Sequence, residues 1–443
     1  MNTENIIIER PSYLEQLKKA AWNGYPKIIT GIRRCGKSFL LNTLYRRWLL
    51  SNGVPNENIL SLDLDDIANS ALRDPINLYD HVLKKTEGKG RCYVFLDEIQ
   101  RVFDIVNPSL TQGRHVLARK DDKEIVGFTD AVMGLSKLSN IDLYVTGSNS
   151  KLLSKDILTQ FRGKATRVPV FPLSFEEIQD VDNRSLEESF KNYLQYGGMP
   201  QVALLDRDQK RTALSDLFET TYFRDIEERH RLRKKDLMKT LCHILASEIG
   251  SLVNPEKIAN TFKSATKEKT SRDSILRLIS YLEESYLIQE ARRYDLKGRK
   301  EIGGNRKYYF IDPGLRNACV GFLFQDQGAV FENVVYNELC RHGFEVFVGS
   351  LDYYEKDAHN KTVRKSGEVD FLARKAGKTI YLQVADNLEE RHTYEREIKP
   401  FLLLKDGIMK RIVVNRVLEE SETEDGFRIL GFQDFFGKFL KTL

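Results

Sequence analysis

The segment GIRRCGKS, at residues 31–38, constrains the fold of this chain more than any other part of the sequence. It fits the pattern G-x-x-x-x-G-K-[ST] and stands between a strand-like run, PKIITG, and a stretch whose apolar residues recur at helical spacing. Strand, glycine-rich loop and helix, in this order, are the setting in which such a loop binds phosphate. The pattern therefore predicts a P-loop domain of the α/β class, built on a parallel sheet.

The residue types of this loop suit the triphosphate tail of a nucleotide. Gly31 and Gly36 allow a turn whose backbone N–H groups point inward, and together with the helix N-terminus these groups form an anion nest. Lys37 is expected to neutralise the β- and γ-phosphates, and the Ser38 hydroxyl to bind Mg²⁺. The predicted nucleotide-binding residues are Gly31, Ile32, Arg33, Arg34, Cys35, Gly36, Lys37, Ser38 and Phe39.

A second strand that ends in acids is expected beside a P-loop, because the metal must also be held from the opposite side. Residues 92–98, CYVFLDE, form a continuous apolar run that is typical of a strand buried on both faces. We assign Asp97 to the Mg²⁺ shell and Glu98 to the polarisation of the attacking water. Two consecutive acids favour an enzyme that hydrolyses the nucleotide over a simple phosphate binder.

A third apolar strand is predicted at residues 141–146, IDLYVT, and Ser148 and Asn149 follow it. Polar side chains at that strand end would lie beside the γ-phosphate and respond to its loss. An ordinary turn, in which Ser150 caps the next helix, is an equally good interpretation. The polar residues 108–127, between the second and third strands, are interpreted as an inserted surface loop.

One arginine is a candidate for stabilising the charge of the transition state. Arg162 is the first choice and Arg167 the second, whereas a solvated surface arginine is the alternative for each. An arginine supplied in trans would require a homo-oligomer.

These segments together resemble the prokaryotic AAA-type ATPases whose C-terminal half is a shared domain of unassigned function. The resemblance rests on GIRRCGKSFLL, YVFLDEIQ, YVTGSNSKLLS, FRGKATRVPVFPLSFEE and YGGMPQ, and for the second half on YFRDI, SYLEESYLI, KYYFIDPGLRN, FENVVYNEL and GEVDF. It implies ATP with Mg²⁺ as the ligand, and the chain contains no Asn-Lys-x-Asp motif for reading guanine. It also implies four parts: an AAA-type P-loop core (1–175), a helical lid and hinge region (176–240), a winged-helix-like domain (241–325) and an inactive restriction-endonuclease-like domain (326–443).

The middle of the chain has the pattern of a winged helix. Two helices, NPEKIANTFK and TSRDSILRLISYLEESYLI, precede two strands, and residues 291–307 carry seven Lys or Arg against two acids. A basic hairpin of this kind suits phosphate contacts with double-stranded DNA, whereas a protein-binding module is the alternative. The predicted DNA contacts are Arg272, Arg277, Arg292, Arg293, Lys297, Arg299 and Lys300.

The C-terminal part carries an incomplete nuclease pattern. A helix acid, a strand Asp and an acid-x-Lys about a dozen residues later are typical of restriction endonucleases, in which the acids hold a divalent ion that activates water. Glu332 and Asp370 fit the first two positions, but Gln383 replaces the second strand acid and Ala385 replaces the lysine. We therefore expect a degenerate site of Glu332, Asp370 and Gln383 in a nuclease-like fold used for binding or assembly.

Composition excludes several classes of protein. A chain of 443 residues with 41% hydrophobic and 30% charged residues is typical of a globular protein with several domains. Charges interrupt every apolar run before the roughly 20 residues of a membrane span, and no signal-peptide pattern begins the chain, so a cytoplasmic protein is expected. Five scattered cysteines predict free thiols, and a net charge of +5 is too small to indicate nucleic-acid binding by itself.

The sequence thus predicts an ATP-binding and ATP-hydrolysing switch coupled to a C-terminal module that binds DNA or protein. Two alternatives remain open: an ATP-dependent DNA-processing nuclease, and a nucleotide-binding scaffold without turnover.

Overall fold

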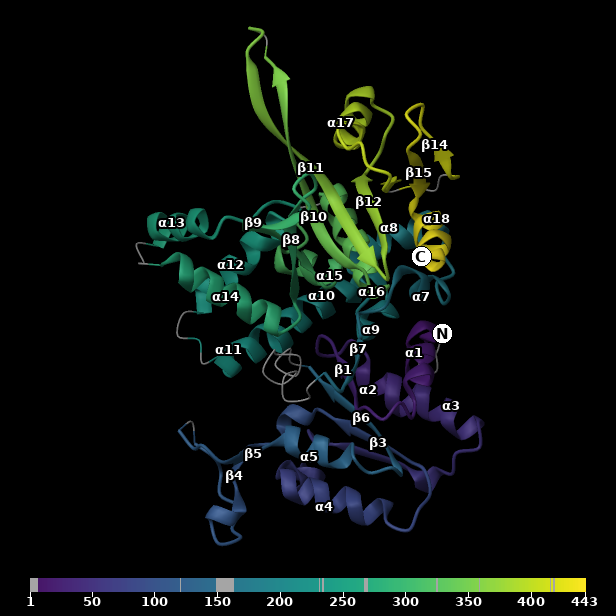
Figure 1. The fold of residues 1–443 in the computed structure, drawn as a ribbon, viewed down its shortest axis with the longest axis vertical. Coiled ribbons are helices and arrows are strands. Elements are labelled where there is room, and N and C mark those ends of the chain that lie inside the picture. The colour runs from purple at the N-terminus through teal and green to yellow at the C-terminus, as the bar shows by residue number, and fades with distance from the viewer. Residues whose placement is uncertain are drawn as a thin grey trace. The chain divides into compact units, whose positions relative to one another are not determined.

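The structure of the chain, a computed structural model, describes residues 7–119, 121–148, 163–230, 232, 235–266, 270–323, 326–357, 359–414, 416 and 419–443. Two units are distinguished within it (Figure 1). The N-terminal unit comprises residues 7–171 with residues 284–286, and the C-terminal unit comprises residues 172–283 and 287–443. None of the helices in the described part of the chain combines the length and apolar character that crossing a bilayer requires.

A parallel five-stranded sheet forms the centre of the N-terminal unit. Its strands are β1 (Lys27–Thr30), β2 (Ile59–Asp63), β3 (Cys92–Asp97), β6 (Ile141–Gly147) and β7 (Thr166–Pro169). They follow the order β2–β3–β6–β1–β7, and every neighbouring pair is parallel. The loops after β1, β3 and β6 therefore leave the sheet at the same, carboxyl edge. The predicted α/β class with a parallel sheet is confirmed.

Helices cover both faces of this sheet. They are α1 (Pro11–Ala20), α2 (Lys37–Phe39) continued by a π-helical segment (Leu40–Tyr45) and α3 (Arg46–Ser51), α4 (Pro75–Thr86) and α5 (Phe128–Leu135). Successive strand residues face opposite sides of a sheet. Accordingly, Val94 and Leu96 pack with residues of α4 and α5, whereas the ring of Phe95 contacts Tyr45 on the other face.

Residues 108–127 were expected to form a surface loop, and the structure corrects this in part. Strands β4 (Ile105–Val106) and β5 (Ile125–Val126) pair in antiparallel fashion, and Ile105 also bridges to Leu117. The segment is therefore a small β-arm, and it exposes apolar side chains such as Leu117 (62% exposed). Its polar composition concealed this pairing, because each strand is only two residues long.

The C-terminal unit begins with a helical region. Its helices are α7 (Phe175–Gln179), α8 (Leu186–Tyr196), α9 (Pro200–Ala203), α10 (Arg207–Asp216) with a π-helical segment (Leu217–Phe223), α11 (Arg224–His230), α12 (Lys235–Ser247), α13 (Pro255–Thr266), α14 (Arg272–Glu284) and α15 (Pro313–Cys319). The chain end returns to this region as α18 (Phe432–Asp434), a π-helical segment (Phe435–Phe439) and α19 (Leu440–Thr442). The ring of Phe432 stacks on Phe190 of α8, with centroids 3.8 Å apart.

An eight-stranded mixed sheet forms the rest of this unit. Its strands are β8 (Ile288–Asp295), β9 (Lys300–Phe310), β10 (Glu345–Lys356), β11 (Thr362–Lys375), β12 (Lys378–Ala385), β13 (Met409–Val414), β14 (Ser421–Glu422) and β15 (Arg428–Gly431), in the order β14–β15–β13–β12–β11–β10–β8–β9. Strand β8 pairs with β10 in parallel, so the β8–β9 hairpin is one edge of this sheet. The expected domain boundary at residue 325 thus falls between strands of one sheet.

Two helices cover opposite faces of this sheet. Helix α16 (Gln327–Arg341) contacts Phe371 of β11 through Tyr336, with ring centroids 5.9 Å apart. The next residue, Leu372, packs in a cluster with Phe401 of α17 (Arg391–Leu402). In chain order the core is α16–β10–β11–β12–α17–β13, which brings residues of both helices and two strands to one cleft.

Candidate functional site

The P-loop connects β1 to α2 in the N-terminal unit. Gly36 has a positive φ of 97° and begins the helix. Gly31 has a φ of 151°, and a Cβ there would collide with the carbonyl oxygen of Val170. Position 31 therefore requires glycine both for its backbone angle and for this close approach.

The lysine of the loop is buried. Lys37 is 4% exposed, and its ammonium donates hydrogen bonds to the carbonyl oxygens of Gly31 and Ile32, each at 3.0 Å. Ser38 and Phe39 are exposed. Phosphate oxygens in this loop would compete with two backbone carbonyls for the ammonium, whereas the Ser38 hydroxyl is accessible to a metal ion.

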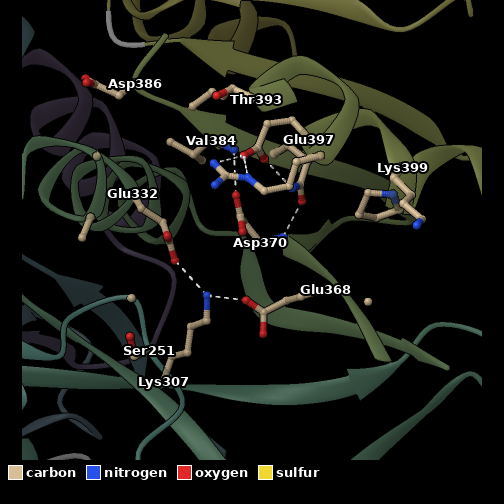
Figure 2. A pocket seen from close by; sticks show the side chains of 18 of the residues that line it. Ser251, Lys307, Glu332, Glu368, Asp370, Val384, Asp386, Thr393, Glu397 and Lys399 are labelled. Atoms are coloured by element: carbon tan, nitrogen blue, oxygen red, sulfur yellow. Dashed lines mark hydrogen bonds and ion pairs between the residues drawn. The ribbon is translucent and has the colours of Figure 1, made fainter. Parts of the chain in front are cut away.

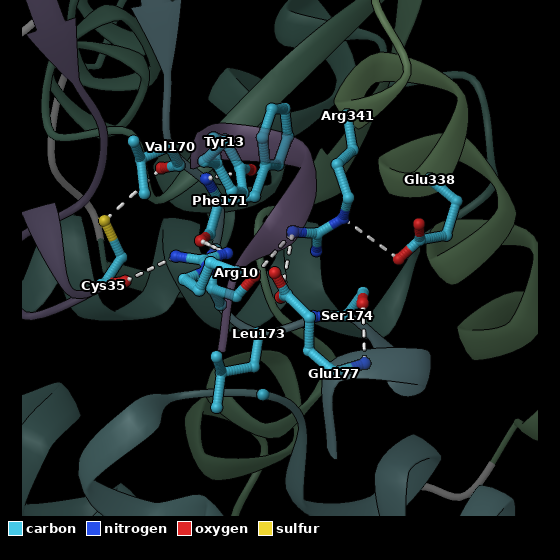
Figure 3. A network of polar contacts seen from close by, with 12 residues as sticks. Arg10, Tyr13, Cys35, Val170, Phe171, Leu173, Ser174, Glu177, Glu338 and Arg341 are labelled. Atoms are coloured by element: carbon cyan, nitrogen blue, oxygen red, sulfur yellow. Dashed lines mark hydrogen bonds and ion pairs between the residues drawn. The ribbon is translucent and has the colours of Figure 1, made fainter. Parts of the chain in front are cut away.

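A buried arginine braces the loop from outside its sequence motif (Figure 3). The guanidinium of Arg10 donates to the carbonyl oxygens of Cys35, at 3.2 Å, and of Phe171, at 2.9 Å. It also lies over the ring of Tyr13. The loop is thereby joined to the segment that follows β7, which supplies the Val170 carbonyl that packs on Gly31. The sequence carries no pattern that marks Arg10 for this position.

The two acids after β3 lie against the end of β6. Thr146 donates its hydroxyl proton to the Asp97 carboxylate and accepts the backbone N–H of Glu98 at 3.1 Å. Ser148 donates to the Glu98 carboxylate at 3.1 Å, and the Gln100 side-chain amide donates to the same oxygen. The parallel register of β3 and β6, which pairs Leu96 with Val145, produces these contacts.

Glu98 has a left-handed backbone conformation with a φ of 53°. This conformation is uncommon for a residue with a side chain and costs free energy. Bonds from its N–H to Thr146 and to Asp97 Oδ1, the latter at 3.2 Å, stabilise it here. The backbone and the carboxylate of Glu98 are therefore both held in place.

The structure brings together part of the predicted nucleotide site. Asp97, Glu98 and Ser148 lie together, and the P-loop leaves the same edge of the sheet. Asn149 and Arg162 lie outside the described residues, and Arg167 is an exposed residue of β7. Thr146 and Gln100 were not predicted, although Thr146 is the polar residue that ends the apolar run IDLYVT.

A magnesium ion carried by nucleotide phosphates fits these donors. Mg²⁺ binds through one or two protein oxygens when phosphates complete its shell. Asp97, which is 5% exposed, and Ser38 supply oxygens of the required type. Among the described residues, no group of three His, Cys, Asp or Glu is arranged to hold a metal ion by itself.

A second candidate site is a cleft of about 780 Å³ in the C-terminal unit (Figure 2). The three residues of the predicted degenerate site all line it: Glu332 from α16, Asp370 from β11 and Gln383 from β12. Three further residues that the sequence did not indicate also line it: Lys307 from β9, Glu368 from β11 and Glu397 from α17. The cleft thus unites charged groups from four elements with the amide of Gln383 from a fifth.

Lys307 is buried among these acids. From the sequence it was expected in an exposed basic hairpin, and the structure corrects this. Its ammonium is 3.1 Å from Glu332 Oε1 and 2.7 Å from Glu368 Oε1. The Tyr309 hydroxyl also donates to Glu332. Burial alone would lower the pKa of Lys307, but Glu332, Asp370 and Glu368 together raise it above its ordinary value, so the ammonium stays charged.

The side-chain amide of Gln383 bonds to one neighbour through its oxygen and to another through its nitrogen. Its oxygen accepts the backbone N–H of Asp370 at 2.8 Å, and its nitrogen donates to Glu397 Oε2 at 2.8 Å. Asp370 Oδ2 in turn accepts the backbone N–H of Val384 at 2.8 Å. Burial raises the pKa of Asp370 well above its ordinary value, and the charge of Glu332 raises it further.

Several of the predicted DNA contacts have partners within the chain. Arg292 pairs with Glu301 at 2.7 Å and with Glu345 at 3.1 Å. Arg293 donates to the Ser350 hydroxyl, and Lys297 donates to the Asp352 carbonyl. Of these partners, only Glu345 adds a negative charge from outside residues 291–307, whereas the Ser350 hydroxyl and the Asp352 carbonyl are neutral. Arg272, Arg277, Arg299 and Lys300 are exposed, as is Lys297, and Arg272 lies 3.9 Å from Asp273.

Comparison with known proteins identifies the parts of the chain. A profile of the AAA domain matches residues 23–179, and two domains of unknown function, DUF8612 and DUF4143, match residues 187–326 and 327–435. An uncharacterised protein of Haemophilus influenzae is 32% identical over 435 residues, which cover 97% of this chain and 98% of that protein. An uncharacterised protein of Methanocaldococcus jannaschii is 29% identical over 392 residues, 85% of this chain and 77% of that protein.

Similar solved structures include two ATPase-related proteins. The Walker-type ATPase PABY2304 of Pyrococcus abyssi is 17% identical, with a TM-score of 0.47, and the match covers 71% of this chain and 96% of that one. AMPPCP-bound DnaA from Aquifex aeolicus is 15% identical, with a TM-score of 0.31, over 63% of this chain and 90% of that one. The profile match, rather than these distant similarities, identifies an AAA domain in the N-terminal unit.

Proposed function

This chain belongs to the family of AAA-domain proteins that includes its full-length Haemophilus influenzae relative, and we propose that its N-terminal unit binds and hydrolyses ATP. One observation supports hydrolysis in particular. Glu98 follows the buried Asp97 and is held by Thr146 and Ser148, at the edge of the sheet where the P-loop also lies. The preference for ATP over GTP rests on the family and on the absence of a guanine-reading motif from the sequence.

Each residue of this site has one role in the proposal. Lys37 and the P-loop N–H groups bind the phosphates, and Ser38 with Asp97 would hold Mg²⁺, which neutralises phosphate charge when it is bound. Glu98 orients the attacking water and accepts its proton. Ser148, which donates a hydrogen bond to Glu98, is the residue that we assign to sensing the loss of the γ-phosphate.

The C-terminal unit supplies the output of this switch in our proposal. Helices α12 to α14 and the β8–β9 hairpin have the order of a winged helix, and the α16–β10–β11–β12–α17–β13 core has the order of a nuclease-like fold. Arg272, Arg277, Arg299 and Lys300 are exposed cations that could contact DNA phosphates. A protein partner that binds this surface is the alternative output.

Two substitutions in the full-length protein test the ATPase. Lys37→Ala should abolish ATP binding measured by calorimetry, because the buried ammonium is lost. Glu98→Gln should bind ATP but release phosphate at least about 100-fold more slowly, because an amide cannot accept the proton of the attacking water. Lys85→Ala, an exposed lysine of α4, is the matched control and should behave as the unmodified protein. Full phosphate release by Glu98→Gln would contradict the assignment.

A further inference from the structure

The acidic cleft of the C-terminal unit contains its own cation. The Lys307 ammonium bridges Glu332 of α16, at 3.1 Å, and Glu368 of β11, at 2.7 Å (Figure 2). We propose that this ammonium occupies the place of the divalent cation that a nuclease-type set of helix and strand acids would hold, so that the cleft does not take up metal. This inference concerns the C-terminal unit and does not depend on ATP hydrolysis.

The source of the lysine matters for this interpretation. In the acid-x-Lys pattern the lysine would stand at position 385, which is alanine here. Lys307 comes instead from β9, an edge strand that joins the sheet through β8 and β10. It is buried, and its two carboxylate partners come from separate elements. The ammonium is therefore held between Glu332 and Glu368 by an ion pair with each of them.

Two further residues of the cleft, Gln383 and Glu397, are also committed to partners within the chain. Gln383 bridges the Asp370 backbone N–H and Glu397, with both distances at 2.8 Å. Glu397 Oε1 accepts from Arg396 at 2.8 Å. A hard divalent cation takes about six or more oxygen ligands, which include water, and the protein contributes carboxylates to this set. Within the described ranges, no three acids, histidines or cysteines are arranged to supply such a set.

Removal of the Lys307 ammonium should allow the cleft to bind a divalent cation. Without the Lys307 ammonium, Glu332, Glu368 and Asp370 would repel one another in a partly desolvated cleft. A divalent ion from solvent would relieve this repulsion, in competition with the proton that Asp370, whose pKa is already raised, can take up. The proposal therefore predicts that a neutral residue at position 307 creates a metal site that the unmodified cleft does not have.

The test measures Mn²⁺ binding to the full-length protein, with Asp97→Ala in every sample to remove the proposed Mg²⁺ ligand of the P-loop. The protein that retains Lys307 should give no binding heat and a thermal midpoint shift below about 1 °C in about 1 mM Mn²⁺. Addition of Lys307→Met should produce binding heat and a shift of roughly 5–10 °C at saturation. Lys399→Met, a half-exposed lysine at the same cleft, is the matched control and should not bind Mn²⁺.

Three results would overturn the proposal. One is saturable Mn²⁺ binding by the protein that retains Lys307, and another is Mg²⁺-dependent nicking of DNA that Asp370→Ala abolishes. The third is a folded Lys307→Met protein that binds no Mn²⁺. If Lys307→Met does not fold, Lys307→Gln retains a hydrogen-bond donor and takes its place. The first two measurements need no substitution of Lys307.

Discussion

Thr146 joins the two acids of the proposed ATPase site through one hydroxyl, so Thr146→Val is a sharp test of how that site is built. Valine has nearly the same shape and removes the bond to Asp97 and the acceptor for the Glu98 N–H at 3.1 Å. The Glu98 N–H then retains its weaker contact with Asp97 Oδ1 at 3.2 Å. The substitution leaves the P-loop contacts of Lys37 untouched.

The size of the effect follows from these contacts. A buried N–H that loses its partner costs about 1–3 kcal/mol. The left-handed backbone of Glu98 costs about 1–2 kcal/mol, which the lost bond would no longer offset. If about 1.4–2.8 kcal/mol of this appears in the barrier, kcat falls about 10- to 100-fold. The Kd for ATP should change less than about threefold, because the lost bonds orient the acids and water rather than bind phosphate.

Steady-state phosphate release and calorimetric ATP binding measure the two quantities separately. Thr86→Val is the matched control, because Thr86 is a buried threonine of the same unit whose hydroxyl bonds to Val82 within its own helix. It should lower stability slightly and leave kcat unchanged. A folded Thr146→Val protein with unaltered kcat would refute the role of Thr146, and an equal loss of kcat in Thr86→Val would show that the effect is not specific.

Two further predictions concern the C-terminal unit. Burial raises the pKa of Asp312 to about 6, although the Asp312 carboxylate accepts the N–H groups of Gly198 and Leu315. As the pH falls, Asp312 therefore takes up a proton in the folded protein at a higher pH than in the unfolded chain. Relative to Asp312→Asn, the free energy of unfolding of the unmodified protein should therefore rise by about 2 kcal/mol as the pH falls from about 7.5 to 4.5 in urea denaturation; parallel pH profiles would contradict this. Changing Arg299 and Lys300 to alanine should reduce the slope of DNA affinity against salt by about two in filter binding, and an unchanged slope would exclude phosphate contacts there.

The parts of the proposed nucleotide site that could be predicted from the sequence are those formed by short contiguous motifs. The P-loop and the acids after β3 belong to short segments whose flanking strand and helix can be recognised in place. Thr146 was missed because it is the last residue of an apolar run, and its contacts with the two acids depend on the register between β3 and β6. Arg10 was missed because the carbonyl oxygens to which it donates, those of Cys35 and Phe171, are 25 and 161 positions away from it in the chain.

The acidic cleft was less predictable because its residues are distant from one another in the chain. Its helix and strand acids follow a known spacing, so Glu332 and Asp370 could be recognised. Lys307 and Glu397 are separated from them by strands and loops, and only the parallel pairing of β8 with β10 brings Lys307 near. Counting charges along residues 291–307 therefore assigned a buried lysine to an exposed hairpin.

The parallel pairing of β8 with β10 also determines how the chain can be divided. The match to one domain of unknown function ends at residue 326 and the next begins at 327, yet hydrogen bonds between strands cross that border. A fragment that began at residue 327 would leave the β10 edge unpaired and open to association with other chains. It would also lose the lysine that neutralises the acids. The acids of the cleft and the lysine that pairs with two of them thus belong to different matched segments, and any movement of the β8–β9 hairpin would also move this lysine.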